Sequence, residues 1–244
     1  MEETGLLLLL LILPVLFYLT SRARAGKGGK LRSLPGMEEL PGLVGRSAET
    51  GQPIHISVGI AGVGGAATAE TWAGLTLLEH LADQATASDT PLIVTLADAT
   101  VLPVAQDILW RAYVRNGNPG GYDPTQVRLI APDPMAYTAG VIGLLEREPL
   151  TANVMVGSFG DEYLLMGEAG ARQGVHQIVG AADPRTLPFV YASADEALVG
   201  EEMFAGGAYT RRLPIQIGSL LAEDWARWAI AAAILVLAIL KIVL

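Results

Sequence analysis

Cysteine is absent from all 244 positions of the chain. This absence excludes disulfide bonds, thiolate metal sites and cysteine nucleophiles. It says little about the compartment, because proteins of both oxidising and reducing environments can lack cysteine.

Charged residues are also scarce. They make up 17% of the sequence, against 51% hydrophobic residues, and the net charge is −9. Nucleic-acid binding requires clustered Lys and Arg, so we expect no nucleic-acid partner. The apolar content excludes a disordered chain and is enough for a sizeable core.

Sequence motifs for hydrolysis and zinc binding are missing. Ser158 does not lie at the centre of a G-x-S-x-G motif, and no histidine stands in a defensible Ser-His-Asp order. His55 lies in a β-branched run and fits a hydrogen-bonded position inside a sheet. No H-x₃-H or H-E-x-x-H spacing occurs. These absences favour a non-enzymatic protein without deciding the question.

Two apolar runs stand near the ends, Gly5–Leu19 and Trp225–Leu244. The first could be a signal peptide, but Glu2 and Glu3 precede it and no A-x-A cleavage site follows. We therefore predict two transmembrane helices, although each is near the lower length limit for a span.

Basic residues flank the inner sides of both runs. They are Arg22, Arg24, Lys27, Lys30, Arg32, Arg211, Arg212 and Arg227. The positive-inside rule then predicts a two-pass cell-membrane protein with a cytoplasmic domain and both termini outside.

Four segments follow from this division. They are a transmembrane helix at 1–21, a basic Gly-rich linker with a short helix at 22–52, a soluble domain at 53–215, and a connector with a second transmembrane helix at 216–244.

The soluble domain alternates between short apolar runs and helical patterns. We predict strands at 53–60, 91–97, 127–131, 152–156, 176–181 and 189–191, and helices at 68–87, 100–115, 133–148, 162–173 and 194–208. Residues 213–217 fit an edge strand or a connector. Apolar strands that alternate with helices predict an α/β fold with a doubly wound, mostly parallel, Rossmann-like sheet.

The turn after the first predicted strand is rich in glycine. Gly62, Gly64 and Ala67 match the G-x-G-x-x-[GA] pattern, which lets a phosphate approach the backbone at a helix N-terminus. The pattern expects an acidic residue about 20 positions on. Asp98 comes 34 positions after Gly64, and no Lys or Arg occurs between 46 and 111. A purely structural turn is therefore the alternative.

A second glycine turn follows the fourth predicted strand. The candidate ligand-binding residues from both turns and the second strand are Gly62, Gly64, Gly65, Asp98, Gly157 and Ser158. The cofactor itself stays undefined.

Acidic residues follow several predicted strands. They are Asp98, Asp133, Asp161, Glu162 and Asp183. Carboxylates gathered at one sheet edge could hold Mg²⁺. Helix capping explains the same positions, because Asp133-Pro134 and Asp183-Pro184 are typical helix starts. We therefore predict no metal site.

Three stretches resemble an uncharacterised family of bacterial membrane proteins with a Rossmann-like domain of unknown function. They are residues 154–168 (VMVGSFGDEYLLMGE), 180–196 (GAADPRTLPFVYASADE) and 59–65 (GIAGVGG). The resemblance covers residues 34–210 and implies membrane attachment, but it supplies no catalytic residues.

Two functions stay open. The first is a membrane-anchored, non-enzymatic assembly or scaffold protein, as a homo-oligomer or a subunit of a larger membrane complex. Its partners would be the lipid bilayer and other subunits. The second is a tethered domain that binds a nucleotide or a small phosphorylated ligand.

Overall fold

The computed structural model describes residues 2–25, 32–210 and 214–243. It divides into two compact units, Ser33–Gly206 and the paired terminal segments Met1–Arg32 and Gly207–Leu244. Several cations that set the predicted membrane orientation lie outside the described residues, namely Lys27, Lys30, Arg211 and Arg212.

A six-stranded parallel sheet forms the centre of the larger unit, with the order β3-β2-β1-β4-β5-β6. The strands are β1 (Ile54–Gly59), β2 (Leu92–Leu96), β3 (Val127–Leu129), β4 (Ala152–Ser158), β5 (His176–Ala181) and β6 (Glu196–Val199). Doubly wound dinucleotide-binding folds have this order, which reverses between the first and fourth strands. The predicted α/β, Rossmann-like fold class is therefore confirmed.

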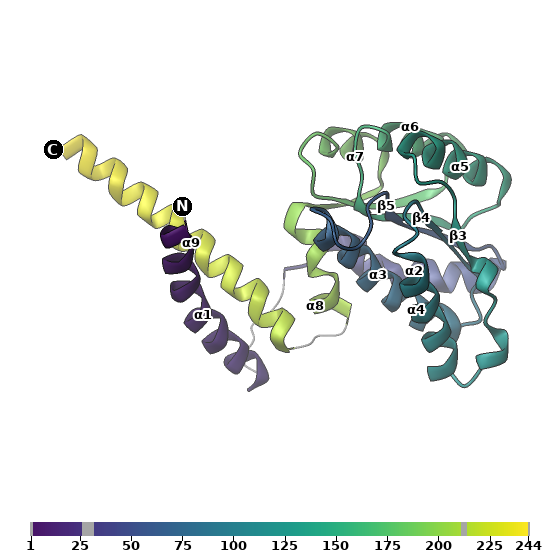
Figure 1. The fold of residues 1–244 in the computed structure, drawn as a ribbon, viewed down its shortest axis with the longest axis horizontal. Helices are drawn as coiled ribbons and strands as arrows, with labels where there is room; N and C mark the ends of the chain where they lie inside the picture. The colour runs from purple at the N-terminus through teal and green to yellow at the C-terminus, as the bar shows by residue number, and fades with distance from the viewer. Residues whose placement is uncertain (1, 26–31, 211–213, 244) are drawn as a thin grey trace. The chain divides into compact units, whose positions relative to one another are not determined.

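Helices cover both faces of the sheet (Figure 1). One face carries α2 (Pro35–Thr50), α3 (Thr68–Ala87) and α4 (Leu102–Arg115), and the other carries α5 (Pro134–Arg147), α6 (Tyr163–Gln173) and α7 (Leu187–Ser193). The short helices η1 (Pro119–Gly121) and η2 (Pro124–Gln126) lead from α4 into β3. Right-handed crossovers produce this division, because the chain runs outward from β1 in one direction and from β4 in the other.

The strand β1 lies between both helix layers, and all its residues are buried. Val58 lies against Gly74 of α3, where an added Cβ would meet the Val58 side chain at 3.1 Å. Ser57 contacts Tyr137 of α5 instead, at 2.6 Å between the two hydroxyl oxygens. The alternation of the strand thus sends apolar side chains to α3 and polar ones to α5.

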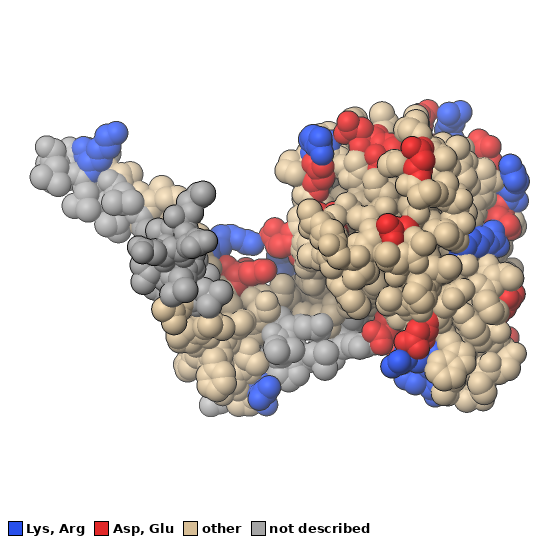
Figure 2. Space-filling model, viewed as in Figure 1, with Lys and Arg blue, Asp and Glu red and all other residues tan. Residues whose placement is uncertain are grey.

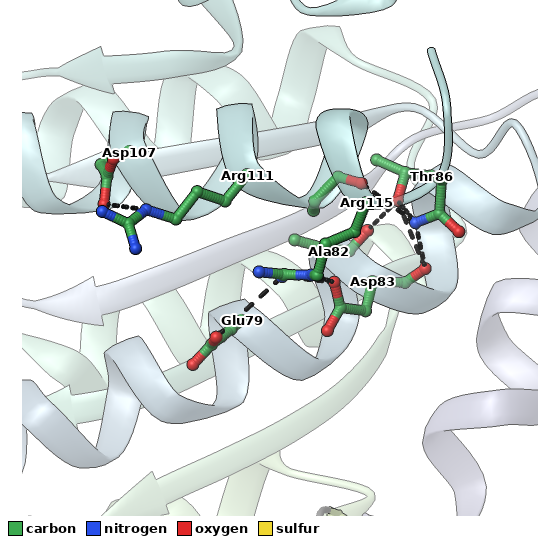
Figure 3. A network of polar contacts seen from close by, with 9 residues as sticks. Glu79, Ala82, Asp83, Thr86, Asp107, Arg111 and Arg115 are labelled. Atoms are coloured by element: carbon green, nitrogen blue, oxygen red, sulfur yellow. Dashed lines mark hydrogen bonds and ion pairs between the residues drawn. The ribbon is translucent and has the colours of Figure 1, made fainter. Parts of the chain in front are cut away.

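The helices α3 and α4 are joined at their carboxyl ends by polar contacts (Figure 3). Arg115 of α4 donates from Nε to Asp83 Oδ1 at 2.9 Å, and Glu79 lies 4.0 Å from the same guanidinium group. Asn116 donates from Nδ2 to Thr86 Oγ1 at 2.7 Å. These contacts align α4 with α3 and lie at the opposite end of both helices from the glycine turn.

The predicted elements between residues 187 and 208 are wrong. The predicted strand 189–191 lies in α7, and the predicted helix 194–208 contains β6, η3 (Gly200–Ala205) and the start of α8 (Gly206–Thr210). Glu196–Val199 has helix-favouring residues, but its pairing with β5 at Ile178↔Glu196 and Ala181↔Val199 overrides that preference.

The smaller unit contains α1 (Glu2–Arg24) and α9 (Pro214–Val243), which run antiparallel (Figure 1). They pack closely at one point, because a Cβ added to Gly218 would overlap Thr20. Residue 213 lies outside the described residues, and residues 214–217, which by sequence fit an edge strand or a connector, form the first turn of α9.

The prediction of two transmembrane helices is wrong. Within the part of the chain that the structure describes, no helix is long and apolar enough to cross a membrane. Gly5–Leu19 is shorter than the roughly 20 residues that a span requires. In α9, Arg227 and Lys241 interrupt the apolar run. The predicted two-pass topology is therefore wrong, and the predicted cytoplasmic domain and external termini lose their basis, because both were derived from these spans.

Candidate functional site

The ends of β1 and β4 meet closely at the carboxyl edge of the sheet. Gly59 pairs with Ser158, and the Ile60 amide donates to the Ser158 carbonyl at 2.9 Å. A Cβ added to Gly157 would overlap the Val58 carbonyl oxygen, and one added to Gly59 would lie 2.5 Å from the Ser158 carbonyl oxygen. Glycine at both positions therefore brings the two predicted glycine turns together where the strand order reverses.

Asp98 lies directly against the first glycine turn. A Cβ added to Gly62 would come within 2.5 Å of the Asp98 carboxyl carbon. By sequence alone, the separation of 34 positions between Gly64 and Asp98 argues against this arrangement, because the usual spacing is about 20. The 20-residue helix α3 accounts for much of the longer spacing. The structure thus brings together Gly62 and Asp98, two of the candidate ligand-binding residues.

Three threonines fix the turn and were not among the predicted residues. Asp98 Oδ1 accepts from the backbone amide of Thr100 at 2.7 Å, and Thr100 Oγ1 accepts from the Val63 amide at 3.0 Å. Thr68 Oγ1 accepts from the Gly64 amide at 2.9 Å. The third, Thr71, is fully buried, and its hydroxyl donates to a carbonyl of the turn. An Asp-x-Thr sequence after a strand could have indicated the first of these contacts.

The charge of Asp98 is stabilised locally. The hydroxyl and backbone amide of Thr100 both donate to the carboxylate and lower the pKa of Asp98. The side chain is therefore ionised at neutral pH. Figure 2 shows basic side chains dispersed among acidic ones on one face of the larger unit.

Two other candidate residues leave room beside the backbone. Nothing lies within 4 Å of a Cβ built on Gly64 or Gly65. Gly64 has φ +104°, so glycine is required there by the backbone conformation and not by space. The turn is thus closely packed at Gly62, against Asp98, and open at Gly64 and Gly65, just before α3.

Asp133 and Asp183 have separate roles. Asp133 caps α5 by accepting from the Ala136 amide at 2.9 Å, which confirms that prediction. Asp183 does not cap α7, because Thr186 occupies the N-cap and Asp183 pairs with Arg185 at 2.7 Å. That pairing lowers the pKa of Asp183. Among the described residues, no three acidic or histidine side chains are grouped to hold a metal ion.

The histidines for which contacts are described lie away from this edge. His55 is fully buried and bonded on both ring nitrogens, as predicted for an inner-face residue. His176 begins β5 at the opposite edge, where Nε2 lies 3.0 Å from Glu39 of α2. Neither is placed to activate Ser158.

Comparison with known proteins identifies the family and no more. No curated protein and no solved structure matches the chain. A family model described as a domain of unknown function, DUF6754, matches residues 2–244. Because this match covers almost the whole sequence, the chain belongs to the DUF6754 family.

Proposed function

We propose that the larger unit binds a nucleotide or a similar small phosphorylated ligand at the carboxyl ends of β1, β2 and β4. The contact between Asp98 and Gly62 carries this proposal. In doubly wound folds, an acidic residue after the second strand bonds the ribose hydroxyls, while the glycine turn admits the pyrophosphate. Here the same two elements lie in contact.

The phosphates would be bound by backbone amides and not by cations. No Lys or Arg lies between 46 and 111, which includes the whole first turn. The helix α3 begins at Thr68 without a side-chain capping bond from Ala67. Its first amides and its dipole therefore favour an anion, and the open space beside Gly64 and Gly65 gives access to them.

The charge of Asp98 sets a preference among ligands. Its carboxylate would accept hydrogen bonds from a ribose that carries free hydroxyls. A 2′-phosphate at the same place would be repelled by this carboxylate, and the segment between residues 46 and 111 has no Lys or Arg to compensate. We therefore expect NAD to bind more tightly than NADP.

Thermal unfolding of the full chain tests the proposal, with NAD, NADP, ATP or GTP added in the presence and absence of Mg²⁺. A ligand at one hundred times its Kd should stabilise the protein by about 2.7 kcal/mol. The proposal fails if no nucleotide shifts the melting temperature.

Two variants locate the ligand. Gly62→Ala places a methyl group against Asp98 and should weaken binding, whereas Gly42→Ala in α2 adds a methyl group to open space and should not. Asp98→Asn should reduce the difference in affinity between NAD and NADP. Unchanged binding by Gly62→Ala would place the ligand elsewhere.

We propose self-association as a second function, with α1 and α9 as the contact surface. Large apolar side chains on these helices are about half exposed or more, among them Phe17 at 78% and Trp228 at 77%. Patches of this kind usually mark interaction sites, because burying apolar area is worth about 25 cal/mol per Å². This observation favours a homo-oligomer over a monomeric scaffold.

Sedimentation equilibrium over a range of concentrations tests this second proposal. The wild-type chain should exceed its monomer mass of 25.6 kDa. Phe17→Ser with Trp228→Ser should shift the mass toward the monomer. Phe204→Ser, which changes an exposed aromatic residue of the larger unit, serves as the control. A monomer at every concentration would refute self-association.

A further inference from the structure

A chain of buried polar side chains lies between the sheet and helices α5–α7. It begins at Gly59, whose amide donates to Ser57 Oγ at 3.2 Å. Ser57 Oγ lies 2.6 Å from the Tyr137 hydroxyl, which lies 2.8 Å from Thr95 Oγ1. These three side chains are fully buried. The chain therefore starts at the residue from which the candidate ligand turn leaves β1.

The chain continues across the sheet through β1, β4 and β5. Thr95 Oγ1 lies 2.8 Å from His55 Nε2, and His55 Nδ1 lies 2.7 Å from Asn153 Oδ1. Asn153 Nδ2 lies 2.9 Å from Gln177 Oε1. The strand register explains the alignment, because His55 pairs with Asn153 and Asn153 pairs with Gln177. Residues in register share one face of the sheet.

The far end of the chain fixes the direction of its hydrogen bonds. Gln177 Nε2 contacts the carbonyl oxygens of Gly167 and Ser193 at 2.9 and 2.8 Å. Carbonyl oxygens only accept, so Gln177 donates both amide hydrogens to them. Gln177 Oε1 is then the acceptor for Asn153 Nδ2. This orientation leaves Asn153 Oδ1 facing His55 as an acceptor.

The orientation of Asn153 also fixes the direction of the hydrogen bonds between His55 and Gly59. Since Asn153 Oδ1 accepts, His55 Nδ1 carries the hydrogen. Burial lowers the pKa of His55 to about 4, so the ring is neutral at pH 7 and Nε2 accepts from Thr95. Thr95 Oγ1 then accepts from Tyr137, and Tyr137 accepts from Ser57. Every donor in the chain therefore points away from the glycine turn.

We infer that this one-way chain holds the start of the ligand turn, with Tyr137 as its positioning residue. Tyr137 connects α5 to both β1 and β2, and its hydroxyl orients the Ser57 hydroxyl. Ser57 Oγ in turn presents a lone pair to the Gly59 amide. Gly59 has φ +91° at a register shift in β1, where the ladder of backbone bonds is irregular. A side-chain acceptor at this point replaces a regular backbone partner. The role of Tyr137 in ligand binding rests on the proposed nucleotide site.

Nitrogen NMR of the histidine rings tests the direction. In the full-length wild-type protein at pH 7, His55 should show a protonated Nδ1 and an unprotonated Nε2. The signal is assigned by its loss in His55→Gln. A protonated Nε2 would reverse the donors on both sides of the ring and overturn the one-way chain.

Hydrogen exchange of the turn amides tests positioning without any ligand. Tyr137→Phe leaves the Ser57 hydroxyl without its acceptor, so exchange of the Gly59 amide should rise by roughly fivefold or more, the change expected for one net hydrogen bond. Ser57→Ala removes the acceptor itself and should do the same. Unchanged exchange at Gly59 in both variants would overturn the positioning role.

Tyr163→Phe is the matched control. Tyr163 is also fully buried on this face, and its hydroxyl bonds a serine, Ser193 Oγ, at 2.8 Å. Its hydroxyl is not part of the chain. This variant should lose comparable stability without faster exchange at Gly59. Equal acceleration in both tyrosine variants would mean that general loosening of the core causes the effect, and would overturn the specific role of Tyr137.

Ligand titration separates this inference from the proposed function. If wild-type protein binds NAD, Tyr137→Phe should raise the Kd by roughly fivefold or more, in line with one net hydrogen bond, and Tyr163→Phe should not. Unchanged affinity in Tyr137→Phe would refute its role in binding while the nucleotide site stands. If the wild-type protein binds no nucleotide, the proposed function fails, and the exchange at Gly59 still decides whether the chain holds the turn.

Discussion

Acid should destabilise the larger unit through His55. Burial without a compensating charge lowers its pKa from 6.5 to about 4 in the folded protein. Between these values the unfolded chain binds a proton that the folded protein does not. The free energy of unfolding therefore falls as the pH falls from 6.5 to 4. At 1.36 kcal/mol per pKa unit, this one residue accounts for about 3 kcal/mol, of which about 2 kcal/mol is lost by pH 4.5.

Urea unfolding at pH 7 and pH 4.5 measures this loss in wild-type protein and in His55→Gln. Glutamine offers a donor and an acceptor to Asn153 and Thr95 but does not titrate. The lowered pKa values of Asp98, Asp123 and Asp183 act equally in both proteins and cancel in the comparison. The stability of the wild-type protein should fall by about 2 kcal/mol more than that of the variant. Equal losses would show that His55 is not held neutral by burial.

Three further substitutions and one control test packing, helix capping and an exposed ion pair by chemical denaturation. Gly74→Ala should cost about 2 kcal/mol, because its Cβ would overlap the Val156 carbonyl and force α3 off the sheet, whereas Gly45→Ala meets open space and should cost nothing. Asp133→Ala should cost about 1 kcal/mol by uncapping α5. Arg115→Ala should cost less than about 1 kcal/mol, since its ion pairs in Figure 3 are solvent-exposed.

Where local pattern and tertiary packing agree, the sequence predicts the fold. The run at 176–181 and the helix at 68–87 have the predicted bounds, because apolar runs and helical periodicity both match their burial. Local sequence pattern and tertiary packing disagree after residue 187. The segment FVY has strand-favouring side chains but lies in α7, where only Val190 is buried. The sheet gains its last strand from the neighbouring EALV segment instead.

The candidate site was only partly predictable for a similar reason. The glycine turn is a local pattern, and it forms at the predicted place. The contact between Asp98 and Gly62 is set by the length of α3 and by strand order, so a fixed spacing rule missed it. No sequence pattern indicates the role of Tyr137, because that role depends on which face of α5 packs against β1.

The close packing at Gly74 and the buried polar chain both arise from the alternation of side chains along β1. Val58 faces α3, whose Gly74 permits close packing, while His55 and Ser57 face α5 and bear the polar chain. Both sets end at Gly59, where the strand becomes the ligand turn. An apolar β1 would pack equally well on both faces. It would also avoid the free-energy cost of burying polar groups, which hydrogen bonds offset only in part. What an apolar strand would lack is a directed acceptor for the Gly59 amide. The polar face of β1 is therefore better explained by control of the turn than by stability of the core.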